Sequence, residues 1–330
     1  MADVRLENVS KSFGSTAAVD NITMTIPDGA FVVLLGPTGA GKTTTLRLIS
    51  GLEKLDRGQV HIAGQNVTQY SPAQRNVAMV FQQYSLYPHL SVRDNLAFPL
   101  RSPILNLPED EIARKVTEIA ETLQIPHKLD NKATELSGGE MQRVSIGRAL
   151  VRDPSIYLMD EPLSSLDAKL RADLRVELKR IQADLGATIL YVTHDQIEAM
   201  TMATHVGVLQ DGKLVQYGTP RDIYENPNSI YVASRLGQPR VNILPANLFD
   251  GSHKGPQIGL RPENIAQGTG AQASITRLEH LGDQTRLHLN LGGVDVITLA
   301  QDGISYEPGE TLRIAPLNPM YFTADGTRVG

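Results

Sequence analysis

The residues GPTGAGKTT, Gly36–Thr44, are the most informative feature of this chain, because they fit the phosphate-binding pattern G-x-x-x-x-G-K-[ST]. The apolar run AFVVLLG at 30–36 comes directly before it and predicts a buried strand, and the run at 44–52 predicts a helix. The pattern requires a strand before the loop and a helix after it. The flanking segments therefore favour a phosphate-binding loop over a glycine-rich turn that matches by chance.

The residues of this loop are expected to surround a triphosphate. Glycines let the backbone wrap closely around phosphate oxygens, and the exposed amides and the helix N-terminus attract the anion. Lys42 is expected to reach the β- and γ-phosphates, and the Thr43 hydroxyl is expected to bind Mg²⁺. The expected nucleotide-binding residues of the loop are Gly36, Pro37, Thr38, Gly39, Ala40, Gly41, Lys42, Thr43 and Thr44.

Composition limits the class of protein. A chain of 330 residues suits two domains, and its 41% hydrophobic and 20% charged residues are ordinary for a soluble globular protein. The formal net charge of −5 argues against a general nucleic-acid binder. The absence of cysteine excludes disulfides and thiolate metal sites and fits a cytosolic protein.

Neither a leader nor a membrane span is expected. The first ten residues, MADVRLENVS, carry Asp3 and Glu7 and contain no apolar run of the kind found in signal peptides. No apolar run in the sequence is long enough to cross a bilayer. Any membrane role would therefore depend on a partner.

Strand and helix patterns alternate through the first two thirds of the chain. Residues 1–30 predict a β-hairpin that leads into the strand before the loop, and 206–218 predict a hairpin that turns at Asp211-Gly212. Alternating strands and helices predict an α/β fold with a mainly parallel, three-layer sheet. Helices are predicted at 108–125, 139–151 and 168–185.

The pattern changes after about Leu236. Short alternating stretches separated by glycine and proline predict a small β-barrel or sandwich. We expect a first domain at 1–236, with a helical subdomain at about 83–152, and a second domain at 237–330.

Polar residues follow three predicted strands. Asp160 and Glu161 end the apolar run SIYLMDE at 155–161, where Asp160 could hold the Mg²⁺ shell and Glu161 could polarise a water for attack on the γ-phosphate. His194 follows another apolar strand and could contact the γ-phosphate, although a histidine there is more often structural. Gln82 ends the strand VAMVF and could contact Mg²⁺ or the attacking water, but one glutamine carries little information by itself.

A second anion site is predicted in the segment LSGGEMQRVSIGRAL, Leu136–Leu150. The Ser137 hydroxyl and the amides of Gly138 and Gly139 precede a helix, which favours anion binding. A second phosphate-binding face on one chain suggests that ATP is held between two surfaces. Phe13 is either a partly buried strand residue or a ring that stacks on adenine.

Together these residues resemble the ATP-binding-cassette (ABC) ATPases over about 3–235, with the motifs in the expected order. The resemblance narrows to the ATPases of carbohydrate importers, of the maltose and glycerol-3-phosphate type. It is carried by Phe13, the phosphate-binding loop, Gln82, the signature LSGGE, the acidic strand end YLMDE, SSLD at 164–167, His194, the stretches MVFQQYSLYPHLSVRDNLAFPL, DEPLSSLDAKLR and THDQIEAM, and NILPA and GLRPENI near the C-terminus.

This resemblance implies a P-loop NTPase cassette with a helical subdomain, followed by a β-barrel domain of the OB or TOBE type. It implies a head-to-tail homodimer in which Lys42 and Thr43 of one copy face the signature of the other across ATP. Asp167 would help to connect the two sites. The fifth signature residue is usually glutamine, whereas Glu140 stands here, at a helix N-terminus that stabilises an acid. Our hypothesis is that Glu140 is tolerated and that Glu140→Gln remains active.

The resemblance also implies catalytic roles for Glu161, His194 and Gln82, and Mg²⁺ contacts from Thr43, Gln82 and Asp160. It implies two transmembrane permease subunits as partners, an extracytoplasmic solute-binding protein as an indirect partner, and a location at the cytoplasmic face of the inner membrane. Aromatic residues in the segment after Gln82 could form a groove for a permease helix or could pack within the helical subdomain. These are Tyr84, Tyr87 and Phe98.

The solute is expected to be a sugar, polyol, sugar phosphate or sulfonated sugar. Import of another solute, such as a polyamine, stays open, and so does a non-transport ABC ATPase. A chromosome-type ATPase would carry a long coiled coil between Lys42 and Ser137, and only one clear helix is predicted there. An oligonucleotide-binding C-terminal module is disfavoured by the acidic net charge and the few aromatic residues, so no nucleic-acid partner is expected.

Overall fold

The computed structural model describes residues 2–103, 105–251 and 253–329. The chain divides into two compact units, one up to Pro220 and one from Arg221. This division precedes the boundary expected near residue 237, because the intervening helices are held by the C-terminal unit. Arg261 donates to the carbonyl oxygen of Ala233 at 2.9 Å and to that of Tyr224 at 2.9 Å. The helices are α7 (Pro220–Glu225) and α8 (Ile230–Ala233).

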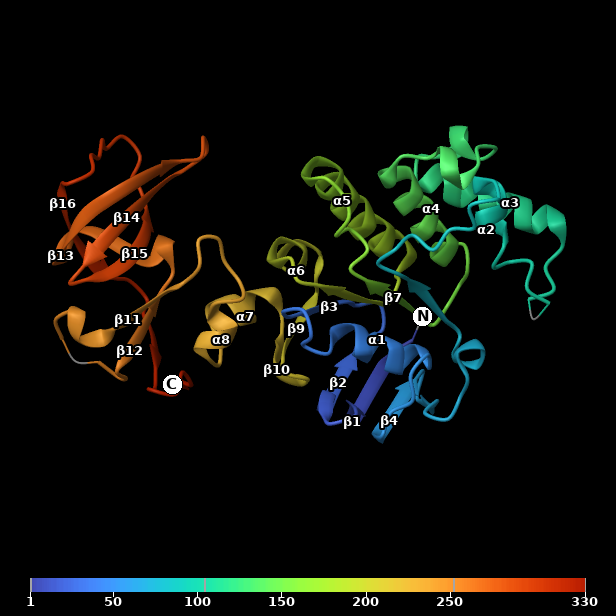
Figure 1. Ribbon diagram of the computed structural model, residues 1–330, viewed down its shortest axis with the longest axis horizontal. Coiled ribbons are helices and arrows are strands. Elements are labelled where there is room, and N and C mark those ends of the chain that lie inside the picture. Colours follow the sequence, from blue (N-terminus) through green and yellow to red (C-terminus); the bar gives the residue numbers. More distant parts are fainter. Residues whose placement is uncertain (1, 104, 252, 330) are drawn as a thin grey trace. The chain divides into compact units, whose positions relative to one another are not determined.

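Two sheets build the N-terminal unit (Figure 1). The larger sheet has the order β10-β9-β3-β8-β7-β6 and is parallel except between β9 and β10. Its strands are β3 (Phe31–Leu35), β6 (Val77–Val80), β7 (Ile156–Asp160), β8 (Ile189–Thr193), β9 (His205–Gln210) and β10 (Lys213–Gly218). The alternation of strand and helix patterns predicted this parallel arrangement.

The hairpin predicted at 1–30 is present, but it belongs to a separate antiparallel sheet. That sheet has the order β2-β1-β4-β5, and β1 pairs with both β2 and β4. Sequence periodicity shows which residues form a hairpin, whereas the sheet that a hairpin joins depends on tertiary packing. The strands are β1 (Val4–Phe13), β2 (Thr16–Ile26), β4 (Arg57–Ile62) and β5 (Gln65–Asn66).

The helices of this unit lie close to their predicted ranges. Three acidic residues lie in the first turn of the helix predicted at 108–125, where their negative charges interact favourably with the helix dipole. The helix predicted at 168–185 has the same bounds in the structure. The helices are α1 (Lys42–Ser50), α2 (Val92–Ala97), α3 (Glu109–Thr122), α4 (Gly138–Leu150), α5 (Ala168–Leu185) and α6 (Gln196–Met202), with short 3₁₀ turns at η1 (Pro72–Arg75), η2 (Pro126–Lys128) and η3 (Ala133–Glu135).

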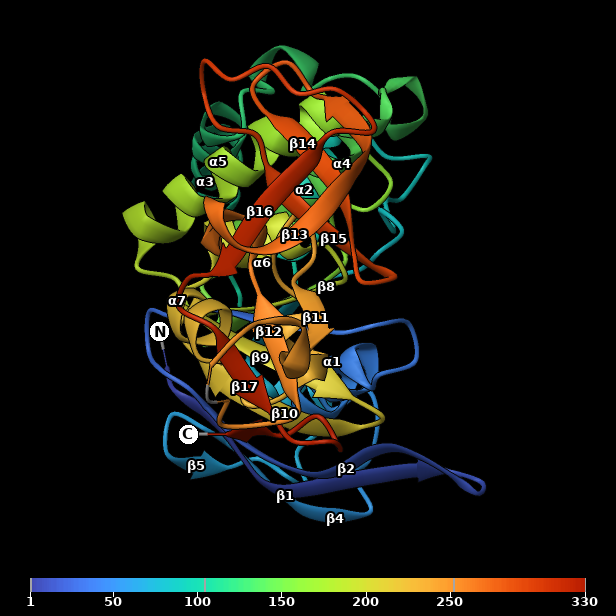
Figure 2. The same ribbon diagram turned by 90° about the vertical axis from the view of Figure 1, so that its left-hand side faces the viewer.

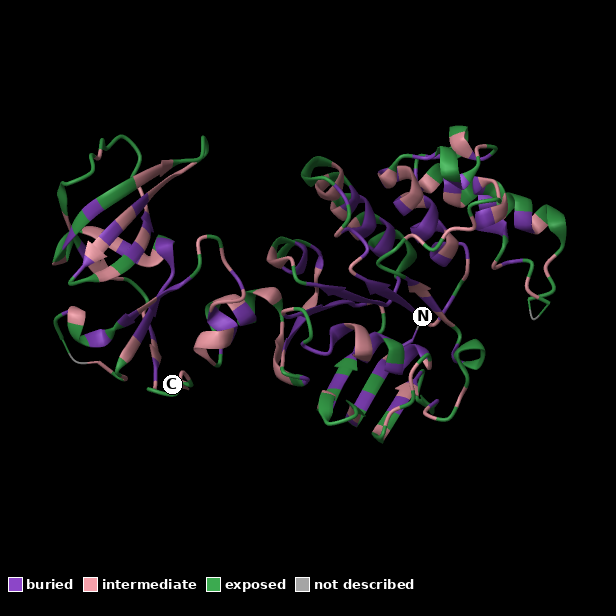
Figure 3. Ribbon diagram, in the orientation of Figure 1, coloured by how far each residue is buried: buried purple, intermediate pink, exposed green. Residues whose placement is uncertain are grey.

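The main core lies between the two sheets. Every residue of β3, β7 and β8 is buried, as Figure 3 shows, which is typical of parallel strands that are covered on both faces. In Figure 1, α1 and the antiparallel sheet cover one face of the parallel sheet, and α5 and α6 lie on the other. Leu46 and Ile49 of α1 pack in one apolar cluster with Leu34 of β3 and Leu6 of β1. This packing holds α1 against β3 and β1, so the loop that joins β3 to α1 has a fixed position.

The C-terminal unit consists of two four-stranded antiparallel sheets, in agreement with the β-rich fold expected there. Their orders are β11-β12-β17-β18 and β15-β14-β13-β16. The long strand β13 lies between β14 and β16, as Figure 2 also shows. The elements are β11 (Asn242–Pro245), η4 (Ala246–Leu248), β12 (Gln257–Leu260), η5 (Pro262–Asn264), β13 (Ile265–His280), β14 (Thr285–Leu291), β15 (Val294–Leu299), β16 (Thr311–Pro316), β17 (Met320–Phe322) and β18 (Arg328–Val329).

Candidate nucleotide-binding and catalytic site

The loop between β3 and α1 can be built only with glycine at two of its positions. Gly41 has φ 98°, and a Cβ atom there would lie 2.3 Å from the carbonyl oxygen of Ala18. A Cβ atom on Gly36 would lie 2.8 Å from the carbonyl oxygen of Leu209. The loop therefore packs tightly against β2 and the β9–β10 hairpin, and its backbone is preformed at the N-terminus of α1.

Lys42 lies inside this loop. Its Nζ atom donates to the carbonyl oxygens of Gly36 at 2.9 Å and Pro37 at 3.0 Å, and it lies 3.7 Å from Oε1 of Glu161. Burial lowers the pKa of Lys42, and the nearby carboxylates of Glu161 and Asp160 oppose that shift. A phosphate is a stronger acceptor for an ammonium group than a neutral carbonyl. Lys42 is thus placed to transfer its hydrogen bonds to a bound phosphate.

Thr43 and Asp160 form the part of the site that suits a magnesium ion. Thr43 Oγ1 donates to Asp160 Oδ1 at 2.9 Å, and Asp160 is 7% exposed at the end of β7. Burial raises the pKa of Asp160, while the hydrogen bond from Thr43 lowers it. A hydroxyl and a carboxylate beside a phosphate-binding loop are the oxygen ligands that Mg²⁺ uses together with waters and phosphates. The residues present therefore fit this ion.

Glu161 has an unusual backbone conformation, and its side chain contacts two other residues of the site. Its φ is 44°, and its carbonyl oxygen accepts from the amide of Ser164 at 3.2 Å and from Ser164 Oγ at 2.9 Å. Its Oε2 atom lies 3.2 Å from Nδ1 of His194, which follows β8. The carboxylate is thus in contact with both an ammonium group and an imidazole. Such a carboxylate can accept a proton from a water held at the γ-phosphate.

The signature turn is a capped helix start. Ser137 is the N-cap of α4, and its Oγ atom accepts from the amide of Glu140 at 3.4 Å. A Cβ atom on Gly139 would lie 2.1 Å from Leu170 Cδ2, so α4 and α5 approach each other closely at this glycine. Within the described residues, no hydrogen bond or ion pair joins 137–140 to the phosphate-binding loop at 36–44 (the P-loop). One copy of the chain therefore brings together Lys42, Thr43, Asp160, Glu161 and His194, but not the signature.

The other predicted site residues lie outside that contact network. The strand β6 ends at Val80, so Gln82 follows the strand rather than ending it, and its side chain is exposed. Phe13 is 50% exposed at the end of β1, with Lys11 Nζ 5.2 Å from its ring centroid. Asp167 is the N-cap of α5 and accepts from the amide of Leu170 at 3.0 Å. Their contacts with adenine, Mg²⁺ or a second copy stay predictions.

Arg75, which was not predicted from the sequence to be a site residue, stabilises the helix that carries Lys42 and Thr43. Arg75 is 4% exposed and donates to the carbonyl oxygens of Leu48 at 2.7 Å and Ile49 at 2.9 Å. It thereby satisfies carbonyls at the C-terminal end of α1, the helix that carries Lys42 and Thr43. One arginine before a strand gives no recognisable signal in a single sequence.

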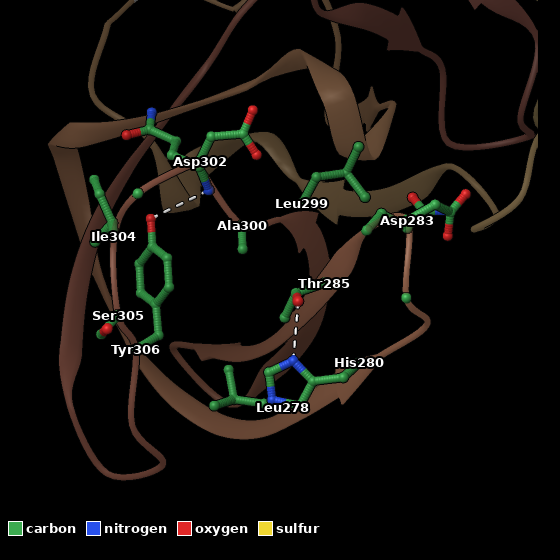
Figure 4. A pocket seen from close by; sticks show the side chains of 14 residues that line it. Leu278, His280, Asp283, Thr285, Leu299, Ala300, Asp302, Ile304, Ser305 and Tyr306 are labelled. Carbon is green, nitrogen blue, oxygen red and sulfur yellow. Dashed lines mark hydrogen bonds between the residues drawn. The ribbon is translucent and has the colours of Figure 1, made fainter.

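A cavity of about 560 Å³ lies in the C-terminal unit, between the β13–β14 turn and the loop after β15 (Figure 4). His280 Nδ1 lies 2.9 Å from Thr285 Oγ1, and Tyr306 receives a hydrogen bond from the amide of Gln301 at 3.4 Å. No residue predicted from the sequence to bind nucleotide or metal lines this cavity.

Two family matches cover the two parts of the chain. Residues 19–164 match the ABC transporter family, and residues 258–317 match the TOBE domain family. An sn-glycerol-3-phosphate import ATP-binding protein of Ruegeria pomeroyi is 43% identical over 312 residues, which is 89% of this chain and 88% of that protein. One from Rhizobium etli is 44% identical over 319 residues, 92% of this chain and 91% of that protein.

Solved structures agree with these matches. A dimeric bacterial ABC transporter cassette has a TM-score of 0.60 and is 30% identical to this chain in sequence. The matched region covers 66% of this chain and 99% of the cassette. An ABC transporter cassette in its ADP conformation has a TM-score of 0.61 and is 28% identical to this chain. The matched region covers 70% of this chain and 98% of that cassette.

The chain belongs to the ABC transporter family and is an ABC-type ATPase, with the P-loop, acidic strand end and signature of that class on one cassette. Within it, the TOBE domain and the relatives, which are sn-glycerol-3-phosphate import ATP-binding proteins, agree with the subfamily that the motifs resemble. The resemblance seen in the motifs is thereby confirmed.

Proposed function

We propose that this protein is the ATP-hydrolysing subunit of an importer for a sugar phosphate such as sn-glycerol-3-phosphate. The observation that carries the proposal is the network around Glu161, in which one carboxylate lies 3.7 Å from Lys42 Nζ and 3.2 Å from His194 Nδ1. The choice of solute is supported by the import proteins for sn-glycerol-3-phosphate, which are 43–44% identical over about nine tenths of the chain.

The mechanism requires two copies. Lys42 and the P-loop amides would bind ATP, and Thr43 and Asp160 would hold Mg²⁺, which neutralises charge on the phosphates. Ser137 and the glycines of a second copy would close over the γ-phosphate. Glu161 would then take a proton from the attacking water, with His194 beside it. Hydrolysis removes the shared γ-phosphate, so the dimer opens because the two states differ in affinity for the nucleotide.

A cavity of about 330 Å³ in the N-terminal unit suits a permease helix. Exposed apolar side chains line it, among them Leu52 at 50% and Phe81 at 39% exposure, together with Tyr84 and Arg148. It lies beside Gln82, so a partner seated there would adjoin the residue that is predicted to contact Mg²⁺ or the attacking water. Within the described residues no helix is long and apolar enough to span a membrane. We propose that this cavity holds each copy of the protein to one of two permease subunits at the cytoplasmic face of the inner membrane.

The docking role is tested by Phe81→Asp. Placing a charge at an apolar contact is expected to abolish co-purification with the permease subunits from detergent extract. ATP affinity should be retained, because Phe81 is outside the P-loop network. Val176→Asp, at a position that is 73% exposed on α5, is the matched control. Normal co-purification of Phe81→Asp would exclude this cavity as the docking site.

The solute is tested by uptake in cells that lack the gene. Wild-type protein should restore uptake of labelled sn-glycerol-3-phosphate, and Glu161→Gln should not. Uptake of labelled maltose, glycerol and spermidine is measured in the same cells as a test of alternative solutes. Restored uptake of one of these, with no uptake of sn-glycerol-3-phosphate, would reject the proposed solute while leaving the ATPase role intact.

A further inference from the structure

The signature turn carries a negative charge beside the groups that would bind phosphate. Oε2 of Glu140 accepts from the amide of Ser137 at 2.8 Å and from Ser137 Oγ at 2.9 Å. Its other oxygen, Oε1, lies 3.1 Å from Nζ of Lys128. The hydrogen bond from the Ser137 amide and the Lys128 ammonium hold the pKa of Glu140 below its ordinary value. Glu140 is therefore ionised at neutral pH.

This arrangement places two demands on Ser137. A hydroxyl has one hydrogen to donate, and here Glu140 receives it. In the proposed dimer, on which this inference rests, the same hydroxyl would donate to the γ-phosphate of ATP bound by the other copy. The carboxylate would also repel that phosphate. The turn can bind ATP well only if the charge of Glu140 is balanced by another group.

Lys128 is the group in position to balance it. It is the last residue of η2, in the segment between α3 and α4, and its side chain reaches the start of α4. The side chains of Lys128 and Glu140 are 28% and 26% exposed, so solvent screens the pair less than a fully exposed one. Within the described residues Glu140 has no other ion-pair partner.

We propose that Lys128 is a positioning residue of the second phosphate-binding face. Its ammonium group compensates the charge of the Glu140 carboxylate, which in the single chain also accepts from the Ser137 hydroxyl. With that charge compensated, the Ser137 hydroxyl and the amides of Gly138 and Gly139 can donate to the phosphates of ATP bound by a second copy. An acidic signature residue thus functions in this chain because a lysine is paired with it.

The test measures the ATP concentration that gives half-maximal dimerisation in the Glu161→Gln background with Mg²⁺ present. Lys128→Met should raise that concentration by about tenfold, because it leaves a unit charge uncompensated near the phosphate in a region of intermediate dielectric. Lys128→Arg should restore most of the wild-type value. Affinity of the monomer for ATP should not change, since the P-loop is untouched.

The decisive measurement is the double variant. In a Glu140→Gln background, Lys128→Met should have no effect on dimerisation, since no carboxylate remains to be neutralised. Lys115→Met, which removes a lysine of α3 that forms no ion pair among the described residues, controls for the loss of net charge. Thermal unfolding without nucleotide checks that each variant is folded.

Two results would overturn the inference while the proposed function stands: an unchanged half-maximal concentration in Lys128→Met, or an undiminished effect of Lys128→Met in the Glu140→Gln background. If the Glu161→Gln parent itself stays monomeric with Mg·ATP, even beside the permease, the proposed ATP-sandwich mechanism is wrong and this inference falls with it.

Discussion

Glu161→Gln is expected to abolish steady-state ATP hydrolysis while preserving ATP binding. The amide has nearly the shape of the carboxylate, so the backbone at φ 44° and the hydrogen bonds from Ser164 to its carbonyl should persist. It cannot accept a proton from water, and loss of a general base costs about 10²–10⁴ in rate. The γ-phosphate then stays in place, so the ATP-bound dimer should accumulate. Phosphate release and analytical size-exclusion chromatography with Mg·ATP measure both effects.

The control is Glu118→Gln, the same chemical change at an exposed position of α3. It should leave hydrolysis and dimerisation unaltered. Near-normal turnover in Glu161→Gln would remove Glu161 from the role of general base. A variant that stays monomeric with saturating Mg·ATP, even beside the permease, would contradict the ATP-sandwich mechanism itself.

Lys42→Ala is expected to weaken ATP binding by between about thirtyfold and about four-thousandfold. Loss of a buried, hydrogen-bonded charge at a binding site costs about 2–5 kcal/mol, and each 1.4 kcal/mol is a factor of ten. Lys42 is 5% exposed and donates to two loop carbonyls, so its removal also leaves Gly36 and Pro37 without these bonds. Isothermal titration calorimetry with ATP gives the dissociation constant directly.

Two comparisons separate lost binding from lost folding. Lys54→Ala removes an exposed lysine just beyond α1 and should bind ATP like the wild type. Thermal unfolding of Lys42→Ala without nucleotide should show a cooperative transition, since the variant keeps the apolar contacts of α1 with β3. An unchanged affinity for ATP in a folded Lys42→Ala protein would contradict the assignment of Lys42.

The elements around the nucleotide site were predictable because each leaves a local pattern. The strand–loop–helix pattern located β3 and α1, and the acidic strand end located Asp160 and Glu161. Helical periodicity gave α5 its bounds of 168–185. These features depend on residues that are neighbours in the chain, so one sequence contains them.

The contacts between these elements were not predictable in the same way. The ion pair of Lys128 with Glu140 joins residues from different segments, as do the contact of His194 with Glu161 and the hydrogen bonds from Arg75 to α1. No periodicity or motif links such residues in a single sequence. The β1–β2 hairpin was likewise predicted, but its place in a separate sheet was not.

The class of chemistry follows from the amino-acid sequence alone, because a phosphate-binding loop requires particular residues at fixed spacing along the chain. It also determined the change from an α/β unit to a β-rich unit, since hydrophobic periodicity reports local structure directly. Which charged side chains come into contact depends instead on how the elements pack. Lys42, Asp160, Glu161 and His194 come from three different strand ends, and the parallel order of β3, β8 and β7 places those ends side by side.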